Sequence, residues 1–213
     1  VTNDYSELYS SIFVQPSGSI YIGPNGGGKI LYSSNGGSNW TTLNSVNTGA
    51  VYGIQFLNAN TGFVCGSLEK KKKTINGGNT WTTLSLPSPM NSYQLNNLYF
   101  LNTNTGWVAG LQGPFSPALI FKTTDGGVSW NSPQNIETNP NGSAVTVQMA
   151  DANKGFALFS PASLFSTTNG GTNWIKTTNP YVLSTQWNTM FVMSKDIIFL
   201  AGEGTSNVKK VIR

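Results

Sequence analysis

The sequence has no histidine, one cysteine and one arginine. The absence of histidine excludes Ser-His and Cys-His catalysis and ordinary imidazole metal sites. Cys65 has no second cysteine with which to form a disulfide in this chain, and a single cysteine does not assign a redox compartment. Nucleic-acid binding needs a basic surface, which the single arginine, Arg213, does not provide. We therefore expect no nucleic-acid partner. We also expect no cofactor and no metal site.

Charged residues make up only 9% of the chain, against about 25% in ordinary globular proteins. The 25 asparagines outnumber the 12 basic and 8 acidic residues together, so amides rather than charges solvate much of the surface. Such surfaces are common on secreted and cell-surface β-proteins, and we therefore expect an extracytoplasmic protein. No run of about 18 apolar residues is present, so no membrane span is expected. The residues that follow Val1 do not have the pattern of a signal peptide. If the protein is exported, its signal peptide has already been removed.

The formal net charge of +4 comes from one run of four lysines, Lys70 to Lys73, without which the chain is neutral. We interpret this run as a solvated strand edge, on which charge discourages pairing with other strands. A surface patch for an anionic partner is the alternative.

An eight-residue motif that ends in tryptophan occurs four times. Its copies are SSNGGSNW (33–40), TINGGNTW (74–81), TTDGGVSW (123–130) and TTNGGTNW (167–174). The tryptophans are 41, 49 and 44 residues apart. A second motif precedes three of these copies, as IQFLNANTGFVCG (54–66), LYFLNTNTGWVAG (98–110) and VQMADANKGFALF (147–159).

Each repeat has the pattern of four short strands separated by turns. In the second repeat we expect strands at 52–57, at 62–66, through the lysines to 74, and at 81–84, because these runs are β-branched or aromatic and end at Asn, Gly or Pro. No helical periodicity is sustained anywhere. Four antiparallel strands at this repeat length are typical of propeller blades, whereas a sandwich does not explain four copies of one turn and solenoid repeats are usually shorter.

We therefore predict an all-β protein, a β-propeller in one domain with four complete blades and a partial fifth. The predicted blades span about 12–43, 54–84, 98–131, 147–177 and 190–213. Two interpretations of the incomplete blade stay open. The ring closes irregularly at five blades, or the chain is part of a larger propeller.

The eight-residue motif is predicted to be a structural hairpin turn between the third and fourth strands. Its first Ser or Thr, and the Asn or Asp two residues later, can hydrogen-bond the local backbone. Its glycines allow positive φ, and its tryptophan supplies a large apolar anchor. The residues with this predicted role are Ser33, Asn35, Gly37, Trp40, Thr74, Asn76, Gly78, Trp81, Thr123, Asp125, Gly127, Trp130, Thr167, Asn169, Gly171 and Trp174.

The motif resembles the Asp-box, or bacterial neuraminidase repeat. With the added Asn-x-x-x-Gly-aromatic element, residues 12 to 202 look most like the photosystem II assembly and stability factor type of propeller. The resemblance implies that the boxes are structural and lie away from the ligand face. It also implies a general scaffolding role. The photosynthetic partner does not transfer, because that role depends on an arginine-rich patch that this chain lacks.

The resemblance also raises two enzymatic readings. Sialidases of this type clamp a carboxylate with three arginines, which Arg213 alone cannot supply. Other Asp-box propellers hydrolyse polysaccharide with a carboxylate pair, so a glycoside hydrolase is the alternative function. The carboxylates available on the loop face opposite the boxes are Glu69, Glu137 and Glu203, with Asp4 and Glu7 as further candidates.

Our preferred hypothesis is a non-catalytic propeller whose loops recognise a protein or a glycan. The loop residues proposed to contact the ligand are Tyr93, Gln112, Phe115, Tyr181, Gln186 and Trp187. Burial between blades is the alternative for each aromatic, and Trp107 is assigned to the core. A further partner hypothesis is strand exchange or self-assembly through the incomplete fifth blade.

Overall fold

The computed structural model consists of short antiparallel strands, and its described residues contain no helix. It describes residues 8–26, 29–43, 49–67, 71–86, 94–111, 118–131, 134–137, 143–160, 163–177, 185–204 and 209–212. No helix in these ranges could cross a membrane.

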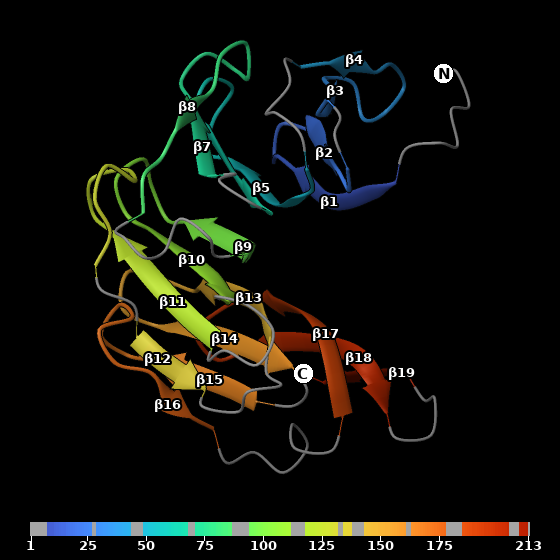
Figure 1. Ribbon diagram of the computed structural model, residues 1–213. Coiled ribbons are helices and arrows are strands. Elements are labelled where there is room, and N and C mark those ends of the chain that lie inside the picture. Colours follow the sequence, from blue (N-terminus) through green and yellow to red (C-terminus); the bar gives the residue numbers. More distant parts are fainter. Residues whose placement is uncertain are drawn as a thin grey trace.

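Four sheets have four strands each, and every strand pairs with its neighbour in sequence (Figure 1). The first sheet contains β1 (Tyr9–Val14), β2 (Ile20–Pro24), β3 (Leu31–Ser33) and β4 (Thr41–Thr42). The second contains β5 (Val51–Phe56), β6 (Gly62–Gly66), β7 (Lys71–Thr74) and β8 (Thr82–Thr83). The third contains β9 (Gln94–Phe100), β10 (Gly106–Leu111), β11 (Ala118–Thr123) and β12 (Gln134–Glu137). The fourth contains β13 (Ser143–Met149), β14 (Gly155–Ser160), β15 (Ser163–Thr167) and β16 (Ile175–Lys176).

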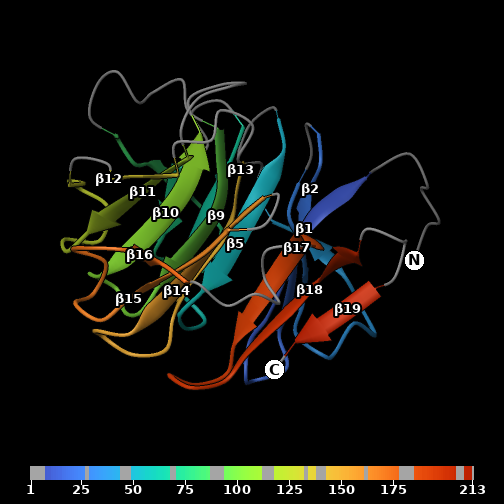
Figure 2. The ribbon, with the colours of Figure 1, turned by 90° about the horizontal axis from the view of Figure 1, so that it is seen from below.

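The fifth sheet has three described strands, β17 (Thr185–Val192), β18 (Ile198–Gly204) and β19 (Lys209–Ile212). The first strands of consecutive sheets contact one another, and Figure 2 shows them gathered toward the middle of the molecule. The arrangement is that of propeller blades around a common axis, and the prediction of four blades with a partial fifth is confirmed.

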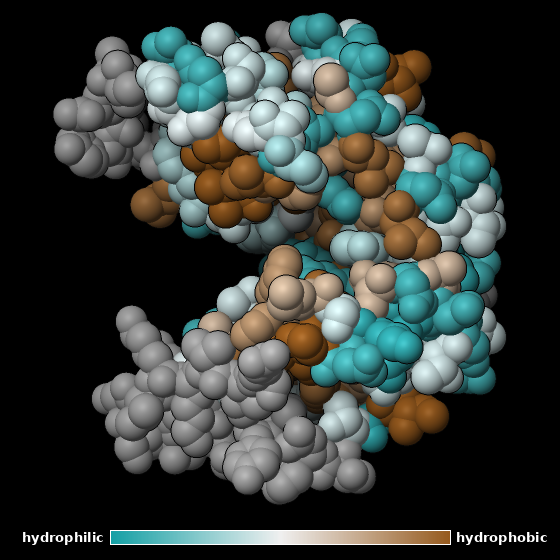
Figure 3. Space-filling view, turned by 180° about the vertical axis from the view of Figure 1, so that it is seen from behind, coloured by the Kyte–Doolittle hydropathy of each residue, from teal (hydrophilic) through white to brown (hydrophobic). Residues whose placement is uncertain are grey.

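Among the described residues, a gap separates the first blade from the fifth (Figure 3). In each blade the first strand carries an apolar residue at the same pairing position, and these residues are Ile12, Ile54, Leu98, Val147 and Met190. The last four are buried against the preceding blade, but Ile12 is 65% exposed. Blade packing therefore leaves β1 with an uncovered apolar face beside the gap.

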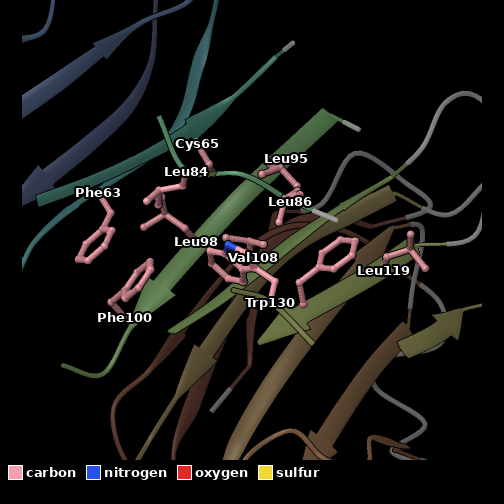
Figure 4. Packing of buried hydrophobic residues seen from close by; sticks show 11 residues of the cluster. Phe63, Cys65, Leu84, Leu86, Leu95, Leu98, Phe100, Val108, Leu119 and Trp130 are labelled. Atoms are coloured by element: carbon pink, nitrogen blue, oxygen red, sulfur yellow. The ribbon is translucent and has the colours of Figure 1, made fainter. Parts of the chain in front are cut away.

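Aromatic side chains from neighbouring blades pack directly against one another. Phe63 of β6 stacks on Phe100 of β9 (Figure 4). Their ring centroids are 3.6 Å apart and their planes differ by 8°. Tyr21 and Phe56 repeat this contact between the first and second blades at 3.8 Å. Gly106, paired opposite Phe100, leaves room for that ring, because a Cβ there would collide with it. The Gly-aromatic element is thus a packing device.

The four boxes have nearly identical geometry. In each, the first hydroxyl accepts a hydrogen bond from the N–H of the second glycine at 2.9 Å. The same hydroxyl donates to the Asn or Asp side chain two residues later, at 2.8 to 3.0 Å. Both glycines have φ between 66° and 91°, a region that favours glycine. These hydrogen bonds and backbone angles close each box as a tight turn.

Three box tryptophans contribute to the interior. Trp130 is buried and meets the ring of Phe100 edge-on, with centroids 6.2 Å apart. Trp81 and Trp174 are partly buried and pack against neighbouring hydrophobic clusters. Trp40 is half-buried in the first blade.

The interpretation of the lysine run as a solvated strand edge is wrong. Lys71, Lys72 and Lys73 lie in β7, which pairs on both sides, with β6 and β8. Lys71 and Lys72 are buried. The Lys73 Nζ lies 5.3 Å from the centroid of the Phe63 ring and donates to the Gly126 carbonyl in the next blade's box. Lys73 therefore supports blade packing, a role that charge alone did not indicate.

The third blade extends further than predicted. Its outer strand β12 reaches Glu137, whereas the other outer strands end within two residues of the box tryptophan. β12 pairs with β11, with an irregularity in the register between Ala118 and Leu119.

One box carries Asp125, and its environment predicts an acid-sensitive contribution to stability. Hydrogen bonds from the Ser129 hydroxyl, the Ser129 N–H and the Thr123 hydroxyl lower the pKa of Asp125 from 3.8 to about 2. A carboxyl whose pKa is lower in the folded state contributes stability above its unfolded pKa, and that contribution is lost as pH falls. The loss is therefore expected between pH 3.8 and about 2.

Thermal unfolding across this pH window measures the effect. Asp125→Asn gives the third box the residue of the other three, so the turn is kept while the titrating group is removed. The unfolding temperature of the native chain should fall relative to that of Asp125→Asn as pH falls through the window, because only the native chain loses the contribution of the carboxylate. Parallel curves would show that Asp125 contributes no acid-sensitive stability.

Candidate functional site

The first strands of all five blades surround a cavity of about 470 Å³ on the ring axis. Its lining is polar and carries no charged side chain among the described residues. The lining residues are Ser10, Tyr52, Gln94, Asn96, Asn97, Thr146, Gln148, Asn188, Thr189 and Met190.

A β-bulge recurs at the same place in every first strand. The pairing between first and second strands skips one residue in each blade, and the skipped residues are Ser10, Tyr52, Asn96, Val145 and Asn188. Ser10, Tyr52, Asn96 and Asn188 line the cavity. Bulges re-aim side chains and are common beside functional sites. This repeated bulge is the backbone feature that places polar groups on the axis.

Side-chain amides also tie the first strands to one another. The Asn97 Oδ1 accepts a hydrogen bond from the N–H of Val147 at 3.0 Å, and the Gln148 Oε1 accepts from Val192 at 2.7 Å. The structure gives neither carboxamide NH₂ group a hydrogen-bond partner in the described part of the chain. These two residues thus hold the cavity wall and present donors for a ligand.

Gln55 makes the most complete of these contacts, just outside the cavity. Its Nε2 donates to the Phe100 carbonyl at 2.9 Å, and its Oε1 accepts from the Phe100 N–H at 2.7 Å. Both backbone groups of a residue in the next blade are satisfied by one side chain. Nothing in the repeat pattern singled out Gln55 or Gln148, although both precede the last residue of a first strand.

Among the predicted ligand-contact residues, the structure describes the side chain of Trp187. Trp187 is fully buried and packs among Phe156, Leu158 and Met190 between the fourth and fifth blades. It is therefore a core residue, and its assignment to a ligand face is wrong, because blade packing covers its ring. Tyr93, Gln112, Phe115 and Tyr181 lie outside the described residues. Gln186 lies in β17, but its side chain is likewise outside them.

The carboxylates considered for catalysis have no described side chains. Asp125, Asp151 and Asp196 lie exposed on separate turns. Glu69, Asp4 and Glu7, and the side chains of Glu137 and Glu203, fall outside the described residues. The described part of the chain holds no cluster of three metal-ligating side chains. Burial raises the pKa of the Cys65 thiol, which disfavours its reactive thiolate form.

Comparisons with known proteins agree with this architecture. The fold is similar to that of YCF48 bound to a D1 peptide, with a TM-score of 0.51 and 13% identity over 96% of this chain and 77% of that chain. A catalytically inactive virginiamycin B lyase from Staphylococcus aureus with quinupristin gives a TM-score of 0.70 and 15% identity, over 100% of this chain and 72% of the lyase. An ancestral GH74 enzyme gives 0.67 and 20% identity over 96% of this chain, which spans only 31% of that enzyme.

At these identities the structural likeness shows the fold alone. The search of curated proteins found no match. The family model described as "Photosynthesis system II assembly factor YCF48" matches residues 32–186, well over half of the sequence. The chain therefore belongs to this family of BNR-type β-propellers.

Proposed function

We propose that this chain is a non-catalytic recognition propeller that binds an uncharged polypeptide segment in its axial cavity. The observation that carries the proposal is the lining, in which amide and hydroxyl side chains from all five first strands converge. Membership in an assembly-factor family supports a binding or scaffolding role.

Polypeptide suits this lining better than other ligands. Carboxamides pair with backbone N–H and C=O groups, and Asn97 and Gln148 already bind backbone N–H groups in the cavity wall. An uncharged lining gives no counterion for a charged ligand. The YCF48 structure similar to this chain is described as bound to a peptide, which supports a protein partner.

A glycan is the competing ligand. Sugar rings commonly stack on exposed aromatic faces, and Tyr52 supplies the aromatic ring among the described lining residues. Trp187, a predicted ligand contact, is buried. The alternative of a polysaccharide hydrolase rests on carboxylates whose side chains lie outside the described residues.

An array of synthetic peptides of equal length and varied net charge, with a glycan array beside it, tests the proposal. Neutral peptides should bind, and Asn188→Ala and Gln94→Ala should each raise Kd by about three- to tenfold, as expected for one lost hydrogen bond. Asn173→Ala is the matched control, because Asn173 is exposed on the fourth box and should leave Kd unchanged. Binding of glycans alone, or release of reducing sugar from xyloglucan, would overturn the proposal.

We also propose that the open fifth blade serves in assembly through strand exchange with another copy. β19 pairs with β18, and the fifth sheet has no fourth described strand, so one edge of β19 can accept a strand. Sedimentation should show association that grows with protein concentration and disappears when residues 208–213 are deleted. A chain that sediments as a monomer at every concentration would refute this.

An extracytoplasmic location is a further proposal. It is supported by the low charged fraction and the amide-rich composition. Fractionation of the source cells tests it, and recovery in the cytoplasm alone would refute it.

A further inference from the structure

Three of the four boxes contain the dipeptide Asn-Gly, at Asn35-Gly36, Asn76-Gly77 and Asn169-Gly170. Asn-Gly is chemically labile because the glycine nitrogen can attack the asparagine side chain without steric hindrance from a Cβ. The rate in a folded protein depends on whether that nitrogen is free to attack. The boxes differ in this respect.

The turn between the first and second strands protects three of the glycine nitrogens. Gly77, Gly126 and Gly170 each donate their N–H to a carbonyl of this turn in their own blade, at 2.9, 2.7 and 2.8 Å. The acceptors are Asn60, Asn104 and Asn153. A nitrogen held by such a bond must first break it before it can attack.

The first blade lacks this protection. Its turn is closed instead by a hydrogen bond from the Gly18 N–H to the Gln15 carbonyl, with Gly18 at φ +86°. The structure gives the Gly36 N–H no acceptor among the described residues. Gly36 is also exposed, whereas Gly77 is half-buried and Gly170 is buried.

The rest of the first and fourth boxes is matched. In both, the asparagine Oδ1 accepts a hydrogen bond from the first hydroxyl at 2.9 Å and from a backbone N–H four residues later at 2.9 Å. The side-chain restraints on Asn35 and Asn169 are therefore equal. The glycine N–H and its burial are the differences that remain.

We propose that Asn35 is a site of spontaneous deamidation, selected by the fold over Asn76 and Asn169. The Gly36 nitrogen loses its proton to solvent and forms a bond to the Asn35 Cγ, and the side-chain nitrogen leaves as ammonia. The resulting succinimide then takes up one water at either carbonyl, which yields aspartate or isoaspartate. No oxidant or reductant takes part.

The two products have opposite effects on the turn. Aspartate gives the first box the carboxylate that Asp125 provides in the third, and that carboxylate accepts the same backbone hydrogen bond. Isoaspartate routes the main chain through the side-chain carbon, which displaces Gly37 from the Ser33 hydroxyl that now accepts its N–H at 2.9 Å. The modification thus either reproduces or breaks the first box.

Incubation of the folded chain at neutral pH, followed by peptide mass spectrometry, measures the conversion at each site. Asn35 should convert about tenfold faster than Asn169, as expected when one hydrogen bond no longer opposes attack, with Asn76 between them. The same chain in denaturant is the control, and there the three sites should convert at similar rates.

A second variant is designed to restore the turn carbonyl that would accept a hydrogen bond from the Gly36 N–H. Pro16→Asn with Gly18→Asn gives the first blade the asparagines found at the matching turn positions Asn58 and Asn60, and should slow Asn35 toward the rate of Asn76. Equal rates at Asn35 and Asn169 in the folded chain, or the same spread of rates in denaturant, would overturn the proposal.

Discussion

Replacing Trp107 with alanine should lower the free energy of unfolding by about 3–5 kcal/mol. The Trp107 side chain is fully buried in the cluster that joins the third and fourth blades. Its indole Nε1 donates to the Gly170 carbonyl in the box of the fourth blade, at 3.3 Å. The substitution removes a fully buried indole from this interface and leaves the carbonyl without that donor. Urea denaturation measures the loss.

Trp107→Phe is the matched control. Phe63 and Phe156 occupy the same pairing position in the second and fourth blades, so the fold already accommodates phenylalanine there. This variant should cost about 1–2 kcal/mol, from the lost hydrogen bond and the smaller ring. If Trp107→Ala cost no more than Trp107→Phe, the ring would not stabilise the interface between these blades.

Replacing Gln55 with methionine should lower the free energy of unfolding by about 2–4 kcal/mol, although Gln55 is only partly buried. Methionine keeps the length of the side chain but removes both hydrogen bonds to Phe100. Phe100 is 2% exposed, so water has little access to the N–H and C=O groups left behind. An unpaired buried polar group costs about 1–3 kcal/mol.

Gln148→Met provides an internal comparison. Gln148 accepts one backbone hydrogen bond, from Val192, where Gln55 makes two. Its replacement should therefore cost about half as much, and the same denaturation experiment compares the two. Equal and small effects would show that the amide contacts between first strands do not hold the blades together.

Much of the fold could be predicted because its signals are local. Each box contains within eight residues the hydroxyl, the side-chain acceptor and the two glycines that close the turn. The spacing of four such turns then indicates the blade. Strand bounds could also be predicted. β6 begins at Gly62 and ends at Gly66, as the sequence predicts.

The errors concern which strands and side chains become buried, which depends on neighbours distant in sequence. Four consecutive lysines indicate an exposed edge, yet β7 lies between two partners and Lys73 reaches the next blade's box. Trp187 follows the amide residue Gln186, and an aromatic beside an amide suggests a ligand face. Packing of the fifth blade on the fourth buries it instead.

The candidate site could not be predicted from the sequence. It depends on a bulge that shifts one residue of each first strand toward the axis, and no residue type marks the bulged position. Ser10, Tyr52, Asn96 and Asn188 share only their place in the pairing register. Polar residues in these strands otherwise look like the solvated face of an ordinary sheet.

Amide hydrogen exchange of the intact chain, with and without the tightest-binding neutral peptide of the array, tests the central claim most directly. If the axial cavity is the recognition site, the peptide should slow exchange in the first strands β1, β5, β9, β13 and β17 and leave the four box turns unchanged. Slower exchange confined to the box turns or to the outer strands β4, β8, β12 and β16 would contradict it.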